Sequence, residues 1–256
     1  MTRLRVRALR LPETRSAQDP CMTNLGHQVA IDFASACALR GLDLAAPFEV
    51  NTWNETAPEL ERLPDLGRSD ALAVLVGNSR RFWPVFLEAL AAKPAHRDDA
   101  HPLDEYVRAS LQDAASGVGI RYELRLGHEM LPRPIPIQRV ARHVGLAALS
   151  PSHLSVHREY GPWIALRAVV VFDIAAPAFT GGPAAEPCHS CARPCVVAFE
   201  RALGPNASRA PDCAHIANDW ERWVAVRDAC PVGMAHRYPD EQIAYHYTKR
   251  RSLLLL

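Results

Sequence analysis

One segment decides the fold of this chain: HREYGPWIALR, which spans residues 157–167. Its Gly-Pro pair predicts a tight turn, and the apolar, β-branched run at 163–173 predicts a central strand directly after that turn. Tyr160 and Trp163 are flat side chains with one polar tip each, and His157 precedes them. The local pattern fits two interpretations: a hairpin whose aromatic residues and histidine belong to the core, or a turn that holds a flat ligand.

Helices and strands are both predicted around this segment. Apolar residues recur at helical spacing in several stretches, whereas a short apolar run and a strictly alternating run predict strands. The predicted helices cover 25–39, 82–92, 103–115, 137–149, 219–226 and 240–249, and the predicted strands cover 70–76, 120–126 and 163–173. This mixture predicts a core in which helices pack on a sheet.

The composition favours a protein without a strong electrostatic field. The 256 residues include 29 Lys and Arg against 28 Asp and Glu, so charge gives no reason to expect a nucleic-acid or anionic-membrane partner. The longest apolar stretches fall far short of the ~18–20 residues that a membrane span needs. We therefore expect a soluble protein, either a monomer or a homodimer.

The two ends of the chain differ in composition from its middle. The first twenty residues are rich in arginine and lack the apolar core of a secretory signal, so we expect a cytoplasmic protein. A transit peptide, a mobile tail and a start at Met22 all remain open for this stretch. The stretch at 175–187 is rich in Ala, Pro and Gly, which marks a break. We predict a tail at 1–22, an α+β domain at 23–177 and a cysteine-rich, helical C-terminal region at 178–256.

Cysteines crowd into this C-terminal region. Of the seven in the chain, five lie between residues 188 and 230: Cys188, Cys191, Cys195, Cys213 and Cys230. Several thiolates at such short spacing are typical of an iron-sulfur or zinc site, because thiolate is a soft ligand. Cys230 precedes a proline, as the last cysteine of a bacterial ferredoxin run does, although the gap before Cys195 is one residue longer than in that run. A structural zinc site and thiols without a metal are the alternatives.

The order of motifs along the chain resembles the CblC family of cobalamin-processing proteins. The stretches that carry the resemblance are 47–55, 71–90, 133–145, 157–167, 220–227 and 238–245, within residues 42–256. The resemblance implies a flavin-reductase-like or nitroreductase-like α+β fold, in which helices flank an antiparallel sheet. It also implies binding of cobalamin with its nucleotide base detached from cobalt, the base-off form, and removal of the upper axial ligand by decyanation or dealkylation.

Two sets of binding residues follow from this resemblance. The implied cobalamin-binding residues are His157, Tyr160, Gly161, Pro162, Trp163, Ile164, Ala165 and Arg167. Arg227 and Arg251 stand where the family would hold the carboxylates of a thiol donor, glutathione, and a guanidinium fork suits that task. A solvated helix surface is the alternative for both arginines. No catalytic residue is identified.

The cysteine cluster departs from CblC and resembles the iron-sulfur domain of epoxyqueuosine reductases. From that resemblance we predict one [4Fe-4S] centre held by Cys188, Cys191, Cys195 and either Cys230 or Cys213, with the Cys-Pro context favouring Cys230. Such a centre could relay electrons from a reductase, a ferredoxin or a flavodoxin to cobalt. Two other functions stay open: a corrinoid iron-sulfur enzyme acting on another substrate, as epoxyqueuosine reductases act on transfer RNA, and a zinc-binding interaction module.

Overall fold

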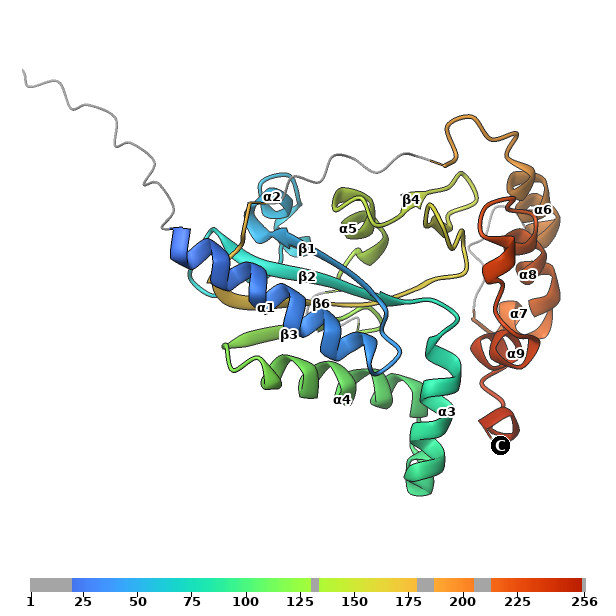
Figure 1. Ribbon diagram of the computed structural model, residues 1–256. Helices are drawn as coiled ribbons and strands as arrows, with labels where there is room; N and C mark the ends of the chain where they lie inside the picture. The colour runs from blue at the N-terminus through green and yellow to red at the C-terminus, as the bar shows by residue number, and fades with distance from the viewer. Residues whose placement is uncertain (1–19, 130–133, 179–186, 205–212, 255–256) are drawn as a thin grey trace, which may run out of the picture.

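The protein is known from a computed structural model that describes residues 20–129, 134–178, 187–204 and 213–254 (Figure 1). Most of the tail predicted at 1–22, and most of the break predicted at 175–187, lie outside the described residues. The three-part division of the chain therefore stays a prediction.

Four antiparallel strands form the main sheet, in the order β1-β2-β6-β3. They are β1 (Leu44–Glu49), β2 (Ala71–Asn78), β3 (Tyr122–Leu126) and β6 (Ala165–Ala175). β6 pairs with both β2 and β3, so the strand predicted after the Gly-Pro turn is central, as expected. The α+β class with an antiparallel sheet is confirmed, while the nitroreductase relationship stays a prediction.

Helices cover both faces of this sheet (Figure 1). The core on one face includes residues of α1 (Pro20–Ala38), α3 (Phe82–Ala92) and α4 (Pro102–Gly117), and the other core includes α2 (Val50–Asn54) and α5 (Ile137–His143). Alternate residues of β2 enter different cores: Val74 packs in the first, and Leu75 packs in the second. Burial on two sides explains why β2 and β6 each contain a continuous apolar run, at 71–76 and 168–172.

Most helices predicted from periodicity are confirmed, but the one predicted over 137–149 is too long. It ends at His143, because Gly145 adopts a left-handed conformation with φ 73° just beyond that end. The chain then forms β4 (Ala148–Leu149), which pairs with β5 (Ser155–Val156). This small hairpin leads into the turn at 157–161.

A layer of short helices lies beside one end of the sheet, at the right of Figure 1. It contains α6 (Pro194–Leu203), α7 (Cys213–Asn218), α8 (Trp220–Asp228) and α9 (Asp240–Thr248). Short 3₁₀ helices occur elsewhere along the chain, at η1 (Glu59–Glu61), η2 (Pro94–Asp98), η4 (Met234–His236) and η5 (Arg251–Leu254). Trp163 shares a small core with Val224 of α8 and Ile243 of α9. The segment 157–167 therefore lies where the sheet meets the helical layer.

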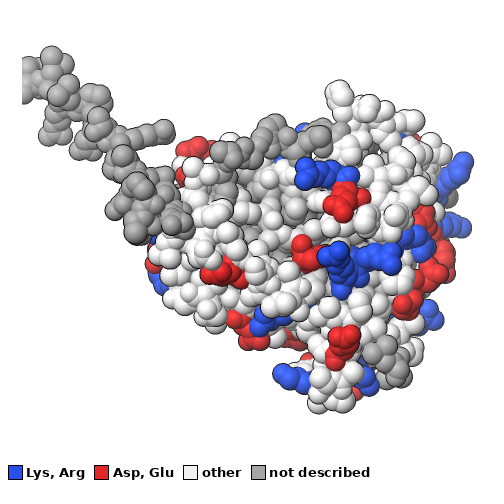
Figure 2. Space-filling view, viewed as in Figure 1, with Lys and Arg blue, Asp and Glu red and all other residues white. Residues whose placement is uncertain are grey.

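The surface fits the even balance of charges. Figure 2 shows basic and acidic side chains interspersed on the face in view. In the described part of the chain, no helix is both long enough and apolar enough to cross a bilayer.

Candidate functional site

The predicted turn is present and closes tightly. The main-chain N–H of His157 donates to the oxygen of Gly161 at 2.8 Å, and the N–H of Gly161 donates to the oxygen of His157 at 2.9 Å. Gly161 has φ 58°, a left-handed conformation that favours glycine. The chain leaves this turn through Trp163, two residues before β6.

The imidazole of His157 is held within the turn. Its Nδ1 accepts the main-chain N–H groups of Glu159 at 3.1 Å and Tyr160 at 3.2 Å, so this nitrogen acts as an acceptor. Burial lowers the pKa of His157, which favours the neutral ring. The ring stacks on Tyr160 with centroids 4.8 Å apart, and Tyr160 meets His236 edge to face at 4.8 Å. In this neutral ring Nε2 carries the proton, so it can act only as a hydrogen-bond donor.

The second half of the segment lines a cavity of about 250 Å³ between β6 and the helical layer. One wall is made of Trp163, Ile164, Ala165 and Arg167, and the opposite wall of Arg227, Tyr238, Ile243, His246 and Tyr247. The Trp163 and Tyr238 rings lie 5.6 Å apart between centroids. Half of the eight predicted cobalamin-binding residues thus share one cavity. His157, Tyr160 and Gly161 are not among the residues that line it.

A β-bulge turns Arg167 toward this cavity. Val76 and Gly77 are neighbours in β2, but they pair with Ala168 and Leu166, which leaves Arg167 as an extra residue of β6. Leu166 packs in one core of the sheet, whereas Ala168 packs in the other. Arg167 reaches the same core as its neighbour Ala168, contrary to the alternation of a regular strand.

Arg167 is fixed by two contacts, one with the last residue of β2 and one with the first residue of α3. Its Nε donates to Oδ1 of the buried Asn78 at 2.6 Å, and its guanidinium carbon lies 5.1 Å from the ring centroid of Phe82. Burial lowers the pKa of Arg167, although a guanidinium remains a cation in proteins. The site therefore contains a positive charge that is held in place by the fold and only partly exposed to water.

The two arginines predicted for a thiol donor lie in different places. Arg227 lines the 250 Å³ cavity, donates from Nη1 to the main-chain oxygen of Pro162, and lies 6.0 Å from the ring centroid of Trp163. Arg251 donates from Nη2 to the main-chain oxygen of Asp99 at 2.9 Å and lines a separate small cavity near the start of α4. The structure does not bring Arg227 and Arg251 to one cavity.

Four of the predicted metal ligands surround another small cavity. Cys188, Cys191, Cys195 and Cys230 line it, together with residues of the β4–β5 connection. Cys195 lies in the first turn of α6, and Cys230 follows α8, which packs on α6. Burial, followed by the nearby thiols of Cys195 and Cys191, raises the pKa of Cys230. The donor set suits a soft metal centre.

The type of ligand fits such a centre, but the arrangement of the ligands does not. Within the described ranges, no three His, Cys, Asp or Glu side chains are arranged to hold one metal ion. The cavity measures about 10 Å³, which is room for about one water molecule and not for a cluster, so the segments that carry these thiols would have to rearrange to accept one. Cys230 lies with the other three cysteines, while the side chain of Cys213 lies outside the described part of the chain.

The turn and the cysteine loop at 230–233 pack main chain against main chain. A Cβ on Gly161 would lie 1.9 Å from the oxygen of Val232, and a Cβ on Gly233 would lie 2.2 Å from the carbonyl carbon of Tyr160. Both glycines have positive φ, 58° and 73°. Only glycine fits either position, so the contact between the two predicted centres depends on this pair.

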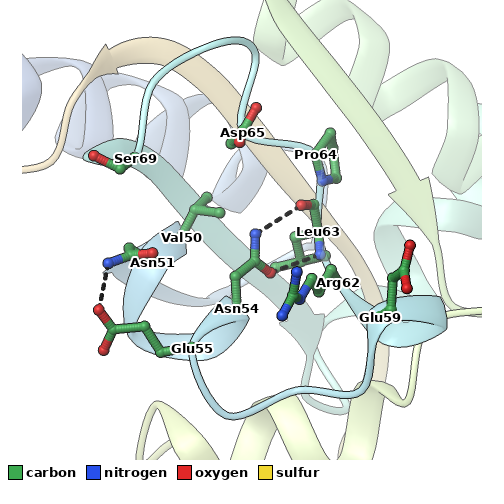
Figure 3. A pocket seen from close by; sticks show the side chains of 10 residues that line it. All are labelled: Val50, Asn51, Asn54, Glu55, Glu59, Arg62, Leu63, Pro64, Asp65 and Ser69. Carbon is green, nitrogen blue, oxygen red and sulfur yellow. Dashed lines mark hydrogen bonds between the residues drawn. The ribbon is translucent and has the colours of Figure 1, made fainter.

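A third cavity, of about 480 Å³, lies beside α2 and the segment 59–69 (Figure 3). The side chain of Asn54 joins these two walls: Nδ2 donates to the oxygen of Leu63 at 2.9 Å, and the N–H of Leu63 donates to Oδ1 at 2.8 Å. No residue predicted for cobalamin or metal lines this cavity. It is separate from the predicted site.

The sequence did not single out the residues that complete the 250 Å³ cavity. Tyr238 lies in a stretch quoted for the family resemblance, and His246 lies just beyond it, within the helix predicted at 240–249. Burial, followed by the charges of Arg167 and Lys249, keeps the pKa of His246 well below its usual value. Periodicity indicates which residues of a helix share a face, but not which strand that face meets.

The antiparallel sheet and the helical layer beside its end define this chain as an α+β protein whose cavity lies between the two. The C. elegans B12-trafficking protein CblC, a homologue of human MMACHC, has the same fold, with a TM-score of 0.67 and 17% identity over 90% of this chain and 96% of that one. Epoxyqueuosine reductase from Bacillus subtilis matches with a TM-score of 0.51 and 15% identity, over 83% of this chain and 67% of that one. An epoxyqueuosine reductase bound to a tRNA-Tyr stem loop matches at 0.51 and 14%, over 84% and 68%. No protein-family model and no curated protein matches the sequence.

Proposed function

We propose that this protein binds base-off cobalamin between β6 and the helical layer and reductively removes its upper axial ligand. One observation carries the proposal: a B12-trafficking protein shares the fold over 90% of this chain and almost all of its own length. The segment 157–167, whose second half lines the 250 Å³ cavity, supplies the corrin-facing residues of this proposal.

The size of the cavity limits how cobalamin can enter. About 250 Å³ is below the roughly 300–1,000 Å³ typical of sites for drug-sized ligands, and a corrinoid is larger than those ligands. The cavity as it stands accepts one arm of the corrin. Binding of the whole ring requires more room than this cavity offers.

In this proposal the chain's own residues bind the corrinoid and shield it from water. Trp163 is 1% exposed and packs behind the cavity in the small core it shares with α8 and α9, while Arg227 ties the helical layer to the turn through Pro162. Removal of cyanide takes one electron, which converts the cob(III)alamin to cob(II)alamin and releases the cyanide anion. A reductase, a ferredoxin or a flavodoxin is the electron donor in this proposal, and glutathione is the thiol that would remove an alkyl ligand.

The cysteines Cys188, Cys191, Cys195 and Cys230 would hold an iron-sulfur centre beside this site. When bound, a [4Fe-4S] centre supplies electrons one at a time. Support comes from the four thiols around one cavity and from the packing of Val232 and Gly233 on the turn.

Titration of the anaerobically purified protein with cyanocobalamin tests the binding step, because loss of the base from cobalt changes the corrin spectrum. Ala165→Leu, which places a larger side chain in the cavity, should weaken binding at least tenfold. Ala92→Leu, an exposed position on α3, adds the same atoms elsewhere and should bind as the wild type does. An unchanged spectrum at excess cobalamin refutes binding. If cobalamin binds but a strong reductant yields no cob(II)alamin, the protein is a carrier and not an enzyme.

A corrinoid reductase acting on another substrate is the second candidate, favoured by the likeness to epoxyqueuosine reductases. Loss of a transfer RNA modification in a deletion strain would support it over the first candidate. A zinc-binding interaction module is the third candidate, favoured by the four thiols. One zinc per chain together with no cobalamin spectral change would select that function.

A further inference from the structure

One short segment joins the two candidate centres, and we call it the strap: residues 230–237. It begins at Cys230, which is 7% exposed and lines the cysteine cavity. Further along the strap, the ring of His236 meets the ring of Tyr160 edge to face, with centroids 4.8 Å apart. A predicted metal ligand and a predicted cobalamin-binding residue are therefore linked through a few residues of main chain.

The contact between the strap and the turn at 157–161 has no side chain in it. Main chain lies directly on main chain at Gly161 and Gly233, because a Cβ on either glycine would overlap the opposite segment. A side chain between two segments can change its rotamer and absorb a shift, but main chains in direct contact cannot. A displacement of the strap at this point therefore displaces the turn as well.

The far end of the strap is fixed by hydrogen bonds. Arg237 donates to Oδ1 of Asp228 at 2.8 Å and to Oδ1 of Asp240 at 2.7 Å. The main-chain oxygen of Ala235 accepts a hydrogen bond from Nη1 of Arg80 at 3.1 Å.

The near end of the strap depends on the thiol site instead. There the side chain of Cys230 lies among the other thiols, where a bound metal would join it to Cys188, Cys191 and Cys195. A metal would therefore fasten the end of the strap that these hydrogen bonds do not reach.

Metal loading must change the geometry of the thiol site. The cavity of about 10 Å³ is far smaller than an iron-sulfur centre. Even a single zinc ion bonds each thiolate at ~2.3 Å, which fixes the sulfur atoms relative to one another. Loading thus alters the position and the freedom of Cys230, and the strap carries this change to Tyr160.

We propose that metal occupancy of the cysteine site controls the order of the turn at 157–161 through the strap. A turn that is already ordered loses less conformational freedom when a ligand binds, so the metal-loaded protein binds cobalamin more tightly than the metal-free protein. The identity of this ligand rests on the proposed function, whereas the coupling of the metal site to the turn does not need a corrinoid. The metal acts here as a clamp, in addition to any electron relay.

Hydrogen exchange of the reduced, anaerobic protein tests the coupling without a corrinoid. Saturating Zn²⁺, added to metal-free protein, should slow amide exchange at 157–163 at least about fivefold and leave the amides of α1 and β3 unchanged. Protection confined to the cysteine segments would overturn the proposal. Failure of the wild type to bind Zn²⁺ would overturn it too.

Two variants that each lack one thiol separate the strap from the metal site. Cys188→Ser and Cys230→Ser both keep three of the four thiols, which suffice for Zn²⁺ at excess, but only Cys230 belongs to the strap. With Zn²⁺ bound, as native mass spectrometry verifies, exchange at 157–163 should slow in Cys188→Ser and not in Cys230→Ser. Equal protection of the turn in both variants would refute the role of the strap.

Cobalamin titration of the wild type gives a further measurement that needs no variant. The Kd for cyanocobalamin should fall about tenfold when Zn²⁺ is bound, and the Kd for Zn²⁺ should fall by the same factor when cobalamin is bound, because coupling is reciprocal. Equal Kd values with and without metal would overturn the proposal and leave the proposed function intact. If the protein binds no corrinoid, the proposed function fails, and the exchange experiment still decides whether the metal site controls the turn.

Discussion

The carboxylate of Asp43 accepts two hydrogen bonds from Ser79: one from the main-chain N–H at 2.7 Å and one from the hydroxyl at 2.6 Å. Asp43 directly precedes β1, and Ser79 directly follows β2, so the pair fastens the two strands at the end of the sheet nearest the cavity. Ser79 is 1% exposed, and its polar groups have little access to water as a substitute partner.

Replacement of this carboxylate should therefore destabilise the fold. We expect Asp43→Ala to lower the free energy of unfolding by about 1.5–3 kcal/mol, the range for hydrogen bonds to a charged group. Asp65→Ala, which removes a single acceptor from the N–H of Gly67 in an exposed loop, should cost less than about 1 kcal/mol. Urea unfolding measures both values, and equal losses would contradict the role assigned to Asp43.

Alanine at Gly161 should disrupt the contact between the turn and the cysteine loop. Gly119 has a similar positive φ, 75°, but open space where a Cβ would stand, so Gly119→Ala measures backbone strain alone, about 1 kcal/mol. Gly161→Ala should lose at least about 2 kcal/mol more, because its Cβ would overlap the oxygen of Val232. Thermal and denaturant unfolding give the difference, and similar losses in both variants would show that the loop moves aside freely.

Acid should weaken the fold through His246. Its pKa in the folded protein is well below the unfolded value of about 6.5, because the ring is buried and lies near Arg167, Lys249 and Arg227. The unfolded chain binds the proton more readily, so this contribution to stability is complete above pH ~6.5 and is lost as the pH falls below it. Wild type should lose up to about 1.4 kcal/mol per pH unit there from this residue.

His246→Phe cannot titrate and should flatten the dependence of unfolding free energy on pH between about 7 and 5. His27→Phe, at an exposed position of α1, should keep the wild-type slope. Some slope should remain in His246→Phe, because burial also lowers the pKa of His143 and His157. Identical slopes for wild type and His246→Phe would refute the assignment.

Metal analysis of anaerobically purified variants tests the thiol centre. Cys230→Ser should lose most of the bound iron and sulfide, because Cys230 lies with the other three predicted ligands. Cys37→Ser should retain them, since Cys37 is a buried thiol in the core of the sheet, with its pKa raised to about 12 by that burial. Cys213→Ser should also retain them. Retention in Cys230→Ser with loss in Cys213→Ser would reverse the choice of fourth ligand, and zinc in place of iron would refute the cluster.

The strands that are buried on both faces could be predicted from the sequence, because β2 and β6 each contain an apolar run, 71–76 and 168–172. β1 could not, since LAAPFE contains a proline and two alanines, which are depleted in strands and are tolerated here at the sheet's edge. The end of α5 was missed because Leu146 and Ala147 continue an apolar pattern past Gly145, the residue that ends the helix.

Only part of the candidate site could be predicted from the sequence, because the rest depends on contacts between distant residues. The segment 157–167 can be recognised in the sequence by its Gly-Pro turn and aromatic residues, and half of its predicted cobalamin-binding residues share the cavity. The bond from Arg167 to Asn78 joins residues 89 positions apart, and the bulge that makes it possible depends on the register between two strands. Neither feature has a local signal in the sequence.

The position of β6 also governs the order in which the fold can form. β1 and β2 pair with each other, but in the sheet β3 pairs only with β6. β3 therefore cannot join the other two strands until residues 165–175 are available. Closing β2 onto β6 brings together residues about a hundred positions apart, the kind of long-range pairing that slows folding. The strand that carries Arg167 must therefore pair before β3 can join the sheet, and we expect substitutions near the bulge to slow refolding.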